Sequence, residues 1–395
     1  MTDAEAEDGV ELGFPVDSSP DTREKIAKRQ LQPWHKPRKQ WVRREQWCKQ
    51  IHQLLGELDL RERAFRYLTL PGEDMLDIRQ LHELFESHSR KLRYLGFDTS
   101  RKSVGMSVSE QEVKSLPFVD DESRTLDDRF EAIGEQGSVA SHHTKRFRSF
   151  DAVNLDLCDA VAARRKQPSQ SSLRAILALL QLQTDNRTEP WVLFLTTRAD
   201  REAVNKDVAN DFLRILIENI RKYERFRVGL KNSLIFSADA VSRELNSGSG
   251  LSDQEFPSAF GVGFCKWLLS CANQTWSVRQ VDAAGYRVNR VGSPDMLSLV
   301  FRFDRMRQEI LDPLGIIPAK RPQRPKQTTK EELNEELEVE FIQRFAEMVD
   351  IDVVLHENQH LRQQLIEENA DLVSLARYDR DDVVAWGRDN CWQPN

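Results

Sequence analysis

The fold is decided by two β-rich runs, SVRQVDAAGYRVN at residues 277–289 and MLSLVFRF at residues 296–303. They are joined by RVGSP, residues 290–294, which contains the glycine and the proline that are typical of turns. Two strands that follow each other this closely pair as an antiparallel hairpin. The sequence therefore predicts a sheet whose last strand runs antiparallel to its neighbours.

Upstream of this hairpin, short apolar runs alternate with helical stripes of apolar residues, starting at Ala64. The predicted strands are Ala64–Leu70, Leu92–Phe97, Ser149–Leu157 and Trp191–Thr196, with a further strand within Arg124–Ile133. The predicted helices are Ile78–Ser87, Val108–Val119, Ser171–Gln183, Val208–Tyr223 and Phe260–Asn273. Such alternation indicates a parallel sheet with helices on both faces. We therefore expect an α/β fold, with a Rossmann-like, mostly parallel sheet, a terminal antiparallel hairpin and a helical C-terminal extension.

Changes in composition divide the chain into five segments. They are an acidic disordered tail (1–22), a basic aromatic arm with a helix (23–60), the Rossmann-like domain (61–312), a basic proline-rich linker (313–330) and an amphipathic helical tail (331–395). Two short amphipathic helices cannot bury their apolar faces alone. We expect the helical tail to dock on the main domain or on a protein partner.

Bulk properties narrow the class of protein. The 395 residues carry a formal net charge of -7, which gives no global reason to expect a nucleic-acid partner. The five cysteines form no CxxC pair, which favours reduced thiols over a disulfide framework. The acidic start lacks the apolar core of a signal peptide, and no apolar run is long enough for a membrane span. We expect a cytoplasmic protein without a membrane partner.

The order of these elements resembles the class I S-adenosylmethionine-dependent methyltransferases, whose sheet ends in such a hairpin. The family's first loop is glycine-rich because its backbone approaches the methionine part of the cofactor. The segment YLTLPGEDMLDI corresponds to the first strand and this loop, so the resemblance gives Leu70, Pro71 and Gly72 a cofactor-binding role. Only Gly72 remains here of the family's glycines.

The resemblance also assigns polar residues at later strand ends. Asp98, after LRYLGF, would accept hydrogen bonds from both ribose hydroxyls of S-adenosylmethionine, although an aspartate there also commonly caps a helix. Asp127, or its neighbour Asp128, would contact the adenine amino group. In SFDAVNLDLCDAV, Asn154 and Asp156, with Asp159 as a further candidate, would lie over the reactive methyl group as catalytic residues, or would serve as turn and cap residues.

Two functions follow from this resemblance. The first is a methyltransferase-like enzyme that binds S-adenosylmethionine and acts on or near nucleic acid. The second is a Rossmann-like scaffold without cofactor, a binding subunit of a multiprotein assembly, which the reduced glycine loop favours.

A third, minor hypothesis rests on the motif HENQH, which matches H-E-x-x-H. On one continuous helix, His356 and His360 could share a zinc ion, with Glu357 as the general base of a hydrolase. The apolar stripe of this segment also explains a helix without any metal, and we expect no metal site elsewhere.

The basic arm carries the nucleic-acid hypothesis. Basic side chains could neutralise phosphates and tryptophans could stack on bases. The residues predicted to do so are Trp34, Lys36, Arg38, Lys39, Trp41, Arg43 and Arg44. The alternative is a docking arm, with its tryptophans buried against the domain and its charges solvated.

Overall fold

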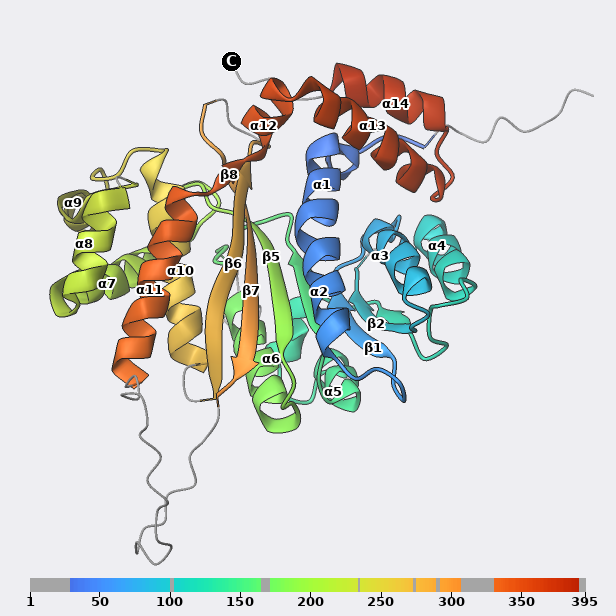
Figure 1. Ribbon diagram of the computed structural model, residues 1–395, viewed down its shortest axis with the longest axis horizontal. Coiled ribbons are helices and arrows are strands. Elements are labelled where there is room, and N and C mark those ends of the chain that lie inside the picture. The colour runs from blue at the N-terminus through green and yellow to red at the C-terminus, as the bar shows by residue number, and fades with distance from the viewer. Residues whose placement is uncertain are drawn as a thin grey trace, which may run out of the picture.

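A sheet of eight strands forms the centre of the computed structural model, which describes residues 29–99, 103–164, 171–233, 235–272, 275–288, 292–306 and 330–390. The strands are β1 (Phe65–Thr69), β2 (Leu92–Phe97), β3 (Arg124–Leu126), β4 (Ala152–Asp156), β5 (Trp191–Arg198), β6 (Trp276–Tyr286), β7 (Met296–Arg305) and β8 (Val349–Asp350). Their order across the sheet is β3-β2-β1-β4-β5-β7-β6-β8 (Figure 1).

The pairing of these strands confirms the predicted fold class. Strands β1 to β5 are parallel, whereas β7 lies between β5 and β6 and runs antiparallel to both. The short strand β8 adds to β6 in parallel. The terminal hairpin is therefore present as the sequence predicts, with its second strand inserted between β5 and the first.

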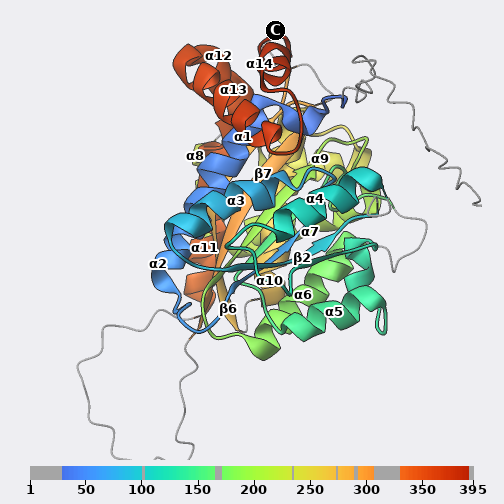
Figure 2. The same cartoon turned by 90° about the vertical axis from the view of Figure 1, so that its right-hand side faces the viewer.

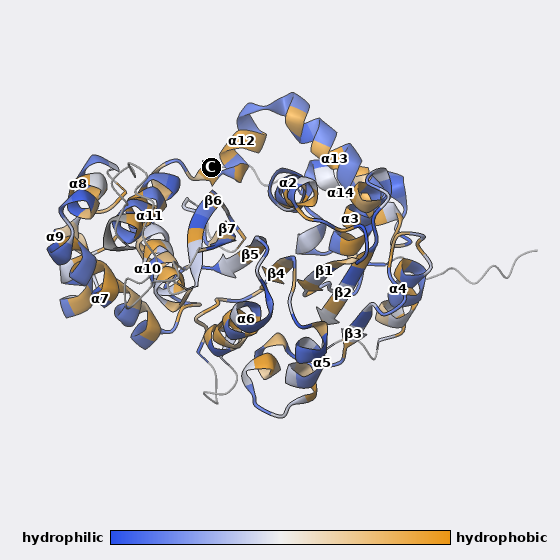
Figure 3. Cartoon of the chain, turned by 60° about the horizontal axis from the view of Figure 1, so that its bottom comes forward, coloured by the Kyte–Doolittle hydropathy of each residue, from blue (hydrophilic) through white to orange (hydrophobic). Residues whose placement is uncertain are grey.

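Helices cover both faces of the sheet (Figures 1 and 2). One face packs against α1 (Pro37–Trp41), the π-helical η2 (Val42–Cys48), α2 (Lys49–Glu57), α3 (Leu76–Ser87), α4 (Val104–Lys114), α12 (Ile351–Glu357) and the middle of α13 (Gln359–Ser374). The other packs against α5 (Val139–Phe147), α6 (Ser172–Asn186), α7 (Lys206–Lys222), α8 (Glu224–Ser233), α9 (Ala238–Ser247), α10 (Glu255–Ala272) and α11 (Lys330–Ala346). The flanking helices are apolar on one side and hydrophilic on another, as packing against the two faces of a sheet requires (Figure 3).

Strand β5 shows why the centre of the sheet is stable. All of its residues are buried except the last, because it has a neighbouring strand on each side and helices on each face. Its first residue, Trp191, stacks on Phe303 of β7 with ring centroids 3.9 Å apart. This run was the clearest strand in the sequence, and its burial explains why.

The helical tail docks on its own chain. Helix α11 packs on α8, α10 and β6, and it buries Phe341 and Phe345. Phe345 reaches so close to Gly261 of α10 that a side-chain carbon there would collide with its ring. Helices α13 and α14 (Arg380–Asp389) form a small core of their own and lie beside α1 (Figure 1). Contact with a protein partner stays a prediction.

Several sequence predictions need correction or lie outside the described residues. The third strand covers only Arg124–Leu126, and the 3-10 helix η3 (Phe130–Gly134) takes up the end of the range predicted for it. Helices α5, α8 and α9 were not predicted. The acidic tail (1–22) and nearly all of the linker (313–330) are not described. Within the described residues, no helix combines the length and the apolar character needed to cross a bilayer.

Candidate functional site

The carboxyl edge of the parallel strands gathers the predicted site residues. Leu70 directly follows β1, Asp98 follows β2 and Asp127 follows β3, while Asn154 and Asp156 belong to the end of β4. Since neighbouring parallel strands end at the same edge, residues far apart in sequence come together there. Open α/β sheets bind their ligands at this edge.

Asp98 and Asp156 both lie within electrostatic range of the thiol of Cys158. Partial desolvation raises the pKa of Cys158, and the negative charges of Asp156 and Asp98 raise it further. The side chain of Asp98 is half-buried, whereas that of Asp127 is exposed. The carboxylates predicted for ribose and adenine contact therefore lie on one accessible edge.

The first loop is tighter than a glycine-rich loop. Pro71 is buried, and a side-chain carbon placed on Gly96 of β2 would lie 3.1 Å from Cγ of Pro71. Gly72 is exposed and has a positive φ of +61°, a conformation that favours glycine. The proline ring thus packs on β2, and the loop lies close to this strand.

Below this loop lies a buried network of polar side chains. The amide of Asn154 donates to the hydroxyl of Tyr67 at 2.8 Å, and this hydroxyl donates to Oδ2 of Asp77 at 3.0 Å. The hydroxyl of Thr69 donates to the same oxygen. Burial raises the pKa of Asp77, although these hydrogen bonds oppose the shift. The network joins the ends of β1 and β4 to the first turn of α3.

Four polar atoms around this network have no hydrogen-bond partner among the described residues. They are Oδ1 of Asn154, Oδ1 of Asp77, and Nε and Nη1 of Arg43. Arg43 is only 4% exposed, and its Nη2 donates to the carbonyl of Trp34 at 3.1 Å. Burial lowers the pKa of Arg43, whereas the charges of Asp156 and Asp77 oppose this, so the guanidinium lies close to both.

Unpaired polar atoms at this depth are informative. A buried donor or acceptor without a partner costs about 1–3 kcal/mol, so such atoms are rare unless a ligand or water completes them. A guanidinium with unused N–H groups is suited to a carboxylate, and two unused oxygens are suited to an ammonium group. The set of atoms matches the two ends of an α-amino acid group.

The basic arm is buried, which contradicts the prediction that Arg38, Lys39, Trp41 and Arg43 contact nucleic acid. Lys39 forms an ion pair with Asp156. Burial lowers the pKa of Lys39, but the charges of Asp156 and Tyr286 and the hydrogen bond to Asp156 together outweigh burial, so the pKa is raised. The docking-arm alternative is right about Trp41 but wrong about these charges, which the protein pairs internally or encloses.

Three of the seven residues predicted to contact nucleic acid remain accessible. Trp34 is 43% exposed, Lys36 is half-buried, and Arg44 pairs with Glu45 at 2.7 Å and with Glu368 at 2.9 Å. Contact between the arm and nucleic acid stays a prediction, and among the seven predicted residues these three are the ones accessible to it.

Asp74, in the first loop, ties the two ends of the chain together. Its carboxylate lies 2.9 Å from Nε2 of His35 and 3.0 Å from Nη1 of Arg29, both in the arm. The hydroxyl of Tyr378, in the tail, donates to it at 3.4 Å. The sequence alone does not reveal this site, because Asp74 and Tyr378 are 304 residues apart in the chain. The arm and the tail therefore close over the first loop. We call these contacts of Asp74 with Arg29, His35 and Tyr378 the clasp.

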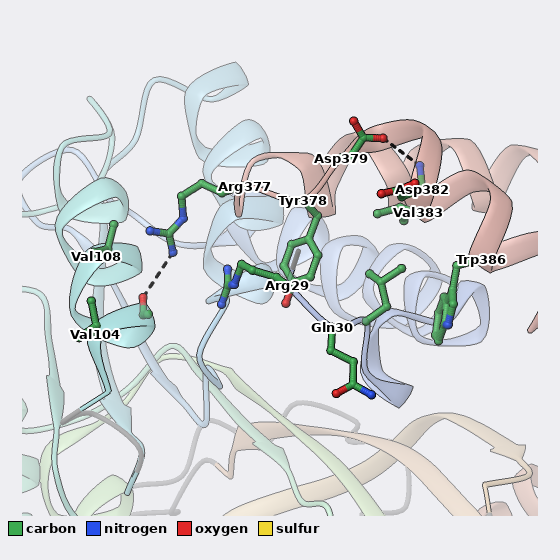
Figure 4. Close-up of a pocket in the computed structure, with 12 residues that line it drawn as sticks. Arg29, Gln30, Val104, Val108, Arg377, Tyr378, Asp379, Asp382, Val383 and Trp386 are labelled. Atoms are coloured by element: carbon green, nitrogen blue, oxygen red, sulfur yellow. Dashed lines mark hydrogen bonds between the residues drawn. The ribbon is translucent and has the colours of Figure 1, made fainter. Parts of the chain in front are cut away.

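A cavity of about 940 Å³ lies beside this clasp, between the arm, α4 and the tail (Figure 4). None of the predicted cofactor residues lines it. Its lining includes Arg29, Leu31, Val104, Val108, Arg377, Tyr378, Val383 and Trp386. Arg377 points across it to α4 and donates to Ser109 at 3.2 Å. The cavity is thus a feature of the closed arm and tail.

The zinc hypothesis is wrong. Helix α12 ends at Glu357, and Asn358 caps the next helix, α13, so His356 and His360 do not share one continuous helix. Both histidines are exposed. Across the ranges that the structure describes, no cluster of three His, Cys, Asp or Glu side chains could hold a metal ion.

Comparison with known proteins adds a family. A family model described as PP_RS20740-like matches residues 28–388. The chain belongs to the PP_RS20740-like family. The description of this family does not name a reaction. No curated protein matches the sequence.

Three solved structures are similar to the chain, each at 11% identity. They are the CMeT domain of the citrinin polyketide synthase (TM-score 0.32, covering 65% of this chain and 52% of that one), an O-methyltransferase family protein from Burkholderia thailandensis (0.27, 68% and 58%) and the CurJ carbon methyltransferase (0.30, 67% and 57%). The chain thus spans between half and three-fifths of their length. Because these TM-scores are low, the fold assignment rests on the order and direction of the strands in this chain.

Proposed function

We propose that this protein binds S-adenosylmethionine at the carboxyl edge of its sheet and acts as a methyltransferase. The observation that carries the proposal is the set of unpaired buried atoms on Arg43, Asp77 and Asn154 at the end of β1 and β4. They provide donors for a carboxylate and acceptors for an ammonium group, and this cofactor ends in both.

Each residue at the edge then has a role. Arg43 holds the carboxylate, while Asp77 and Asn154 accept hydrogen bonds from the ammonium group. Asp98 accepts from the ribose hydroxyls and Asp127 from the adenine amino group. The backbone of Leu70, Pro71 and Gly72 borders the methionine part.

Asp156 completes the site on the acceptor side. The bound cofactor supplies an electrophilic methyl group, and the protein's contribution is to align an acceptor with it and to exclude water. Asp156 lies at the end of β4 and is held by Lys39, so it positions a polar acceptor instead of acting as a free base. Asn154 orients the same end of the strand through Tyr67.

Calorimetry with two ligands tests this assignment. S-adenosylhomocysteine has the amino acid group, and 5′-methylthioadenosine has the same nucleoside without it. We expect Arg43→Met to weaken binding of the first about 10- to 100-fold, the worth of one or two charged hydrogen bonds, and to leave the second unchanged. Arg44→Met, at the neighbouring arginine whose partners Glu45 and Glu368 are half-buried, is the matched control and should bind both ligands normally.

The same titration separates the site from the fold. Asp98→Ala should weaken both ligands, since both contain the ribose. No binding of either ligand at millimolar concentration overturns the proposal. Equal losses of both ligands in Arg43→Met would show that this residue only supports the fold.

A second function, a scaffold without cofactor, is favoured by a different observation. The ring of Pro71 packs on Gly96, and the arm and tail close over the first loop. If neither ligand binds, this second function is the better account, and it predicts that Gly96→Ala destabilises the fold by about 1–3 kcal/mol through overpacking against Pro71.

A further inference from the structure

The opposite, amino edge of the sheet carries a hollow of about 150 Å³ surrounded by positive charge. Five arginines line it, together with His143, Phe147 and a single acidic residue, Glu122. The arginines are Arg66, Arg93, Arg124, Arg146 and Arg148. We call this the amino-edge hollow.

Topology brings these arginines together. Arg66 and Arg93 are the second residues of β1 and β2 and lie directly beside each other in the parallel register. Arg124 begins β3, while Arg146 and Arg148 come from the end of α5. Because parallel strands all begin at one edge, residues spread over 83 positions of sequence meet there.

Their charges are mostly uncompensated. Arg93 pairs with Asp120 at 2.9 Å and with Glu122 at 2.8 Å. Within the described residues, the other four arginines form no ion pair. Arg66 donates instead to the carbonyl of Phe147 at 3.1 Å. Like charges side by side on neighbouring strands are destabilising unless an anion offsets them.

Besides burial, the excess of positive charge contributes to lowering the pKa of two groups in the hollow, Arg66 and His143. Burial lowers the pKa of Arg66, and among the further causes the charge of Asp151 opposes the shift while those of Arg63, Arg187 and Arg93 add to it. Burial also lowers the pKa of His143, and the charges of Arg124 and Arg146 add to the effect.

A second basic hollow continues the first. It measures about 410 Å³, shares Arg66 and Arg93 with the amino-edge hollow, and has two acidic residues in its lining, Glu62 and Asp120. The further basic residues are Arg61, Arg63, Arg90 and Lys91. Arg61 and Arg63 are paired with carboxylates, so this hollow is the weaker of the two. Together they form a basic path along the starts of β1, β2 and β3.

We propose that this amino-edge path binds the phosphate backbone of a nucleic-acid strand. Guanidinium groups match phosphate oxygens in geometry and charge, and adjoining hollows suit a chain of successive phosphates better than one isolated phosphate. The site lies at the edge opposite the cofactor site, so it does not depend on the proposed function. The proposed nucleic-acid contact thus lies at the amino edge of the sheet and not on the buried arm.

Fluorescence anisotropy with labelled oligothymidylate tests the proposal. Arg146 and Arg148 are exposed, so the double variant Arg146→Glu and Arg148→Glu should fold normally, as a thermal melt would verify. The matched control is Arg214→Glu with Arg221→Glu, an equal change of charge on exposed positions of α7, at the far end of the molecule (Figure 1). We expect the first variant to bind at least about tenfold more weakly and the control to bind like the wild type.

Salt dependence sharpens the readout. The slope of log affinity against log salt should fall by about 1.4 in the first variant, because each of the two arginines neutralises one phosphate and each phosphate of a single strand contributes about 0.7. No salt-dependent binding by the wild type overturns the proposal, and so does equal weakening in the control. Binding of inorganic phosphate without binding of oligothymidylate also overturns it, because the hollow would then take a small anion.

Discussion

The two edges of the sheet treat positive charge in opposite ways. At the carboxyl edge, cations of the arm are buried and find partners inside the protein, as Lys39 does with Asp156 and Arg38 with Asp352 at 3.2 Å. At the amino edge, Arg66, Arg124, Arg146 and Arg148 stay at least partly accessible and form no ion pair within the described residues.

A dense basic run in a sequence therefore does not by itself locate an anion site. The arm has the higher density of Lys and Arg, yet its charges hold the molecule closed. The amino-edge arginines are thinly spread along the chain and are gathered only by the fold. Uncompensated charge, not the number of charges, points to a partner.

The largest expected effect comes from breaking the carboxyl-edge pairing. Asp352 is buried, pairs with Arg38 and accepts the backbone N–H of Arg287 at 2.7 Å. Asp352→Ala leaves Arg38 buried without this carboxylate, and we expect the free energy of unfolding to fall by about 3–5 kcal/mol. Urea denaturation measures it.

The control for this prediction is an exposed pair. Asp211 and Arg214 lie on the surface of α7, so Asp211→Ala should cost no more than about 1 kcal/mol. A loss in Asp352→Ala as small as in this control would mean that the buried pair does not hold the arm.

A smaller effect on the free energy of unfolding is expected when the pH falls, because His35 in the clasp resists protonation. Burial lowers the pKa of His35 despite its hydrogen bond to Asp74. The unfolded imidazole then binds a proton near pH 6.5 while the folded one does not, so stability is lost as the pH falls below about 6.5. We expect a loss of about 1 kcal/mol between pH 7 and pH 5 that is absent in His35→Gln.

Denaturation at both pH values checks this. The variant His52→Gln, at an exposed position, should retain the wild-type slope. Identical slopes for the wild type and His35→Gln would show that the clasp does not respond to protons in this range.

The smallest expected effect is a gain in stability, and it comes from a substitution at the amino edge. Arg124→Gln removes one of several repelling cations, so we expect a gain of about 0.5 kcal/mol in unfolding free energy at low salt. The gain should shrink as salt screens the repulsion. Arg221→Gln, on α7, should show neither effect. A salt-independent loss of stability in Arg124→Gln would contradict the comparison of the edges.

The sequence predicted the sheet well because its signals are local. Apolar runs such as WVLFLT at residues 191–196 specify strands by themselves, and a terminal hairpin is visible from two runs and their turn. Ordering the strands then placed Asp98, Asp127 and Asp156 at one edge. The predicted roles of these residues still await the ligand.

What the sequence missed depends on contacts between distant segments. Burial of Lys39 requires Asp156, and the clasp on Asp74 requires both ends of the chain. The HENQH motif looks helical, but Asn358 ends one helix and caps the next. Arg66, Arg93 and Arg124 each look like an ordinary strand charge until the register places them around one hollow.

One crossed titration tests the central claim, that the two edges bind different ligands. Wild-type protein, Arg43→Met and the Arg146→Glu, Arg148→Glu double variant are each titrated with S-adenosylhomocysteine and with oligothymidylate. We expect Arg43→Met to lose binding of the first ligand alone and the double variant to lose binding of the second alone. Loss of both ligands in one folded variant, or of neither in both, would contradict it.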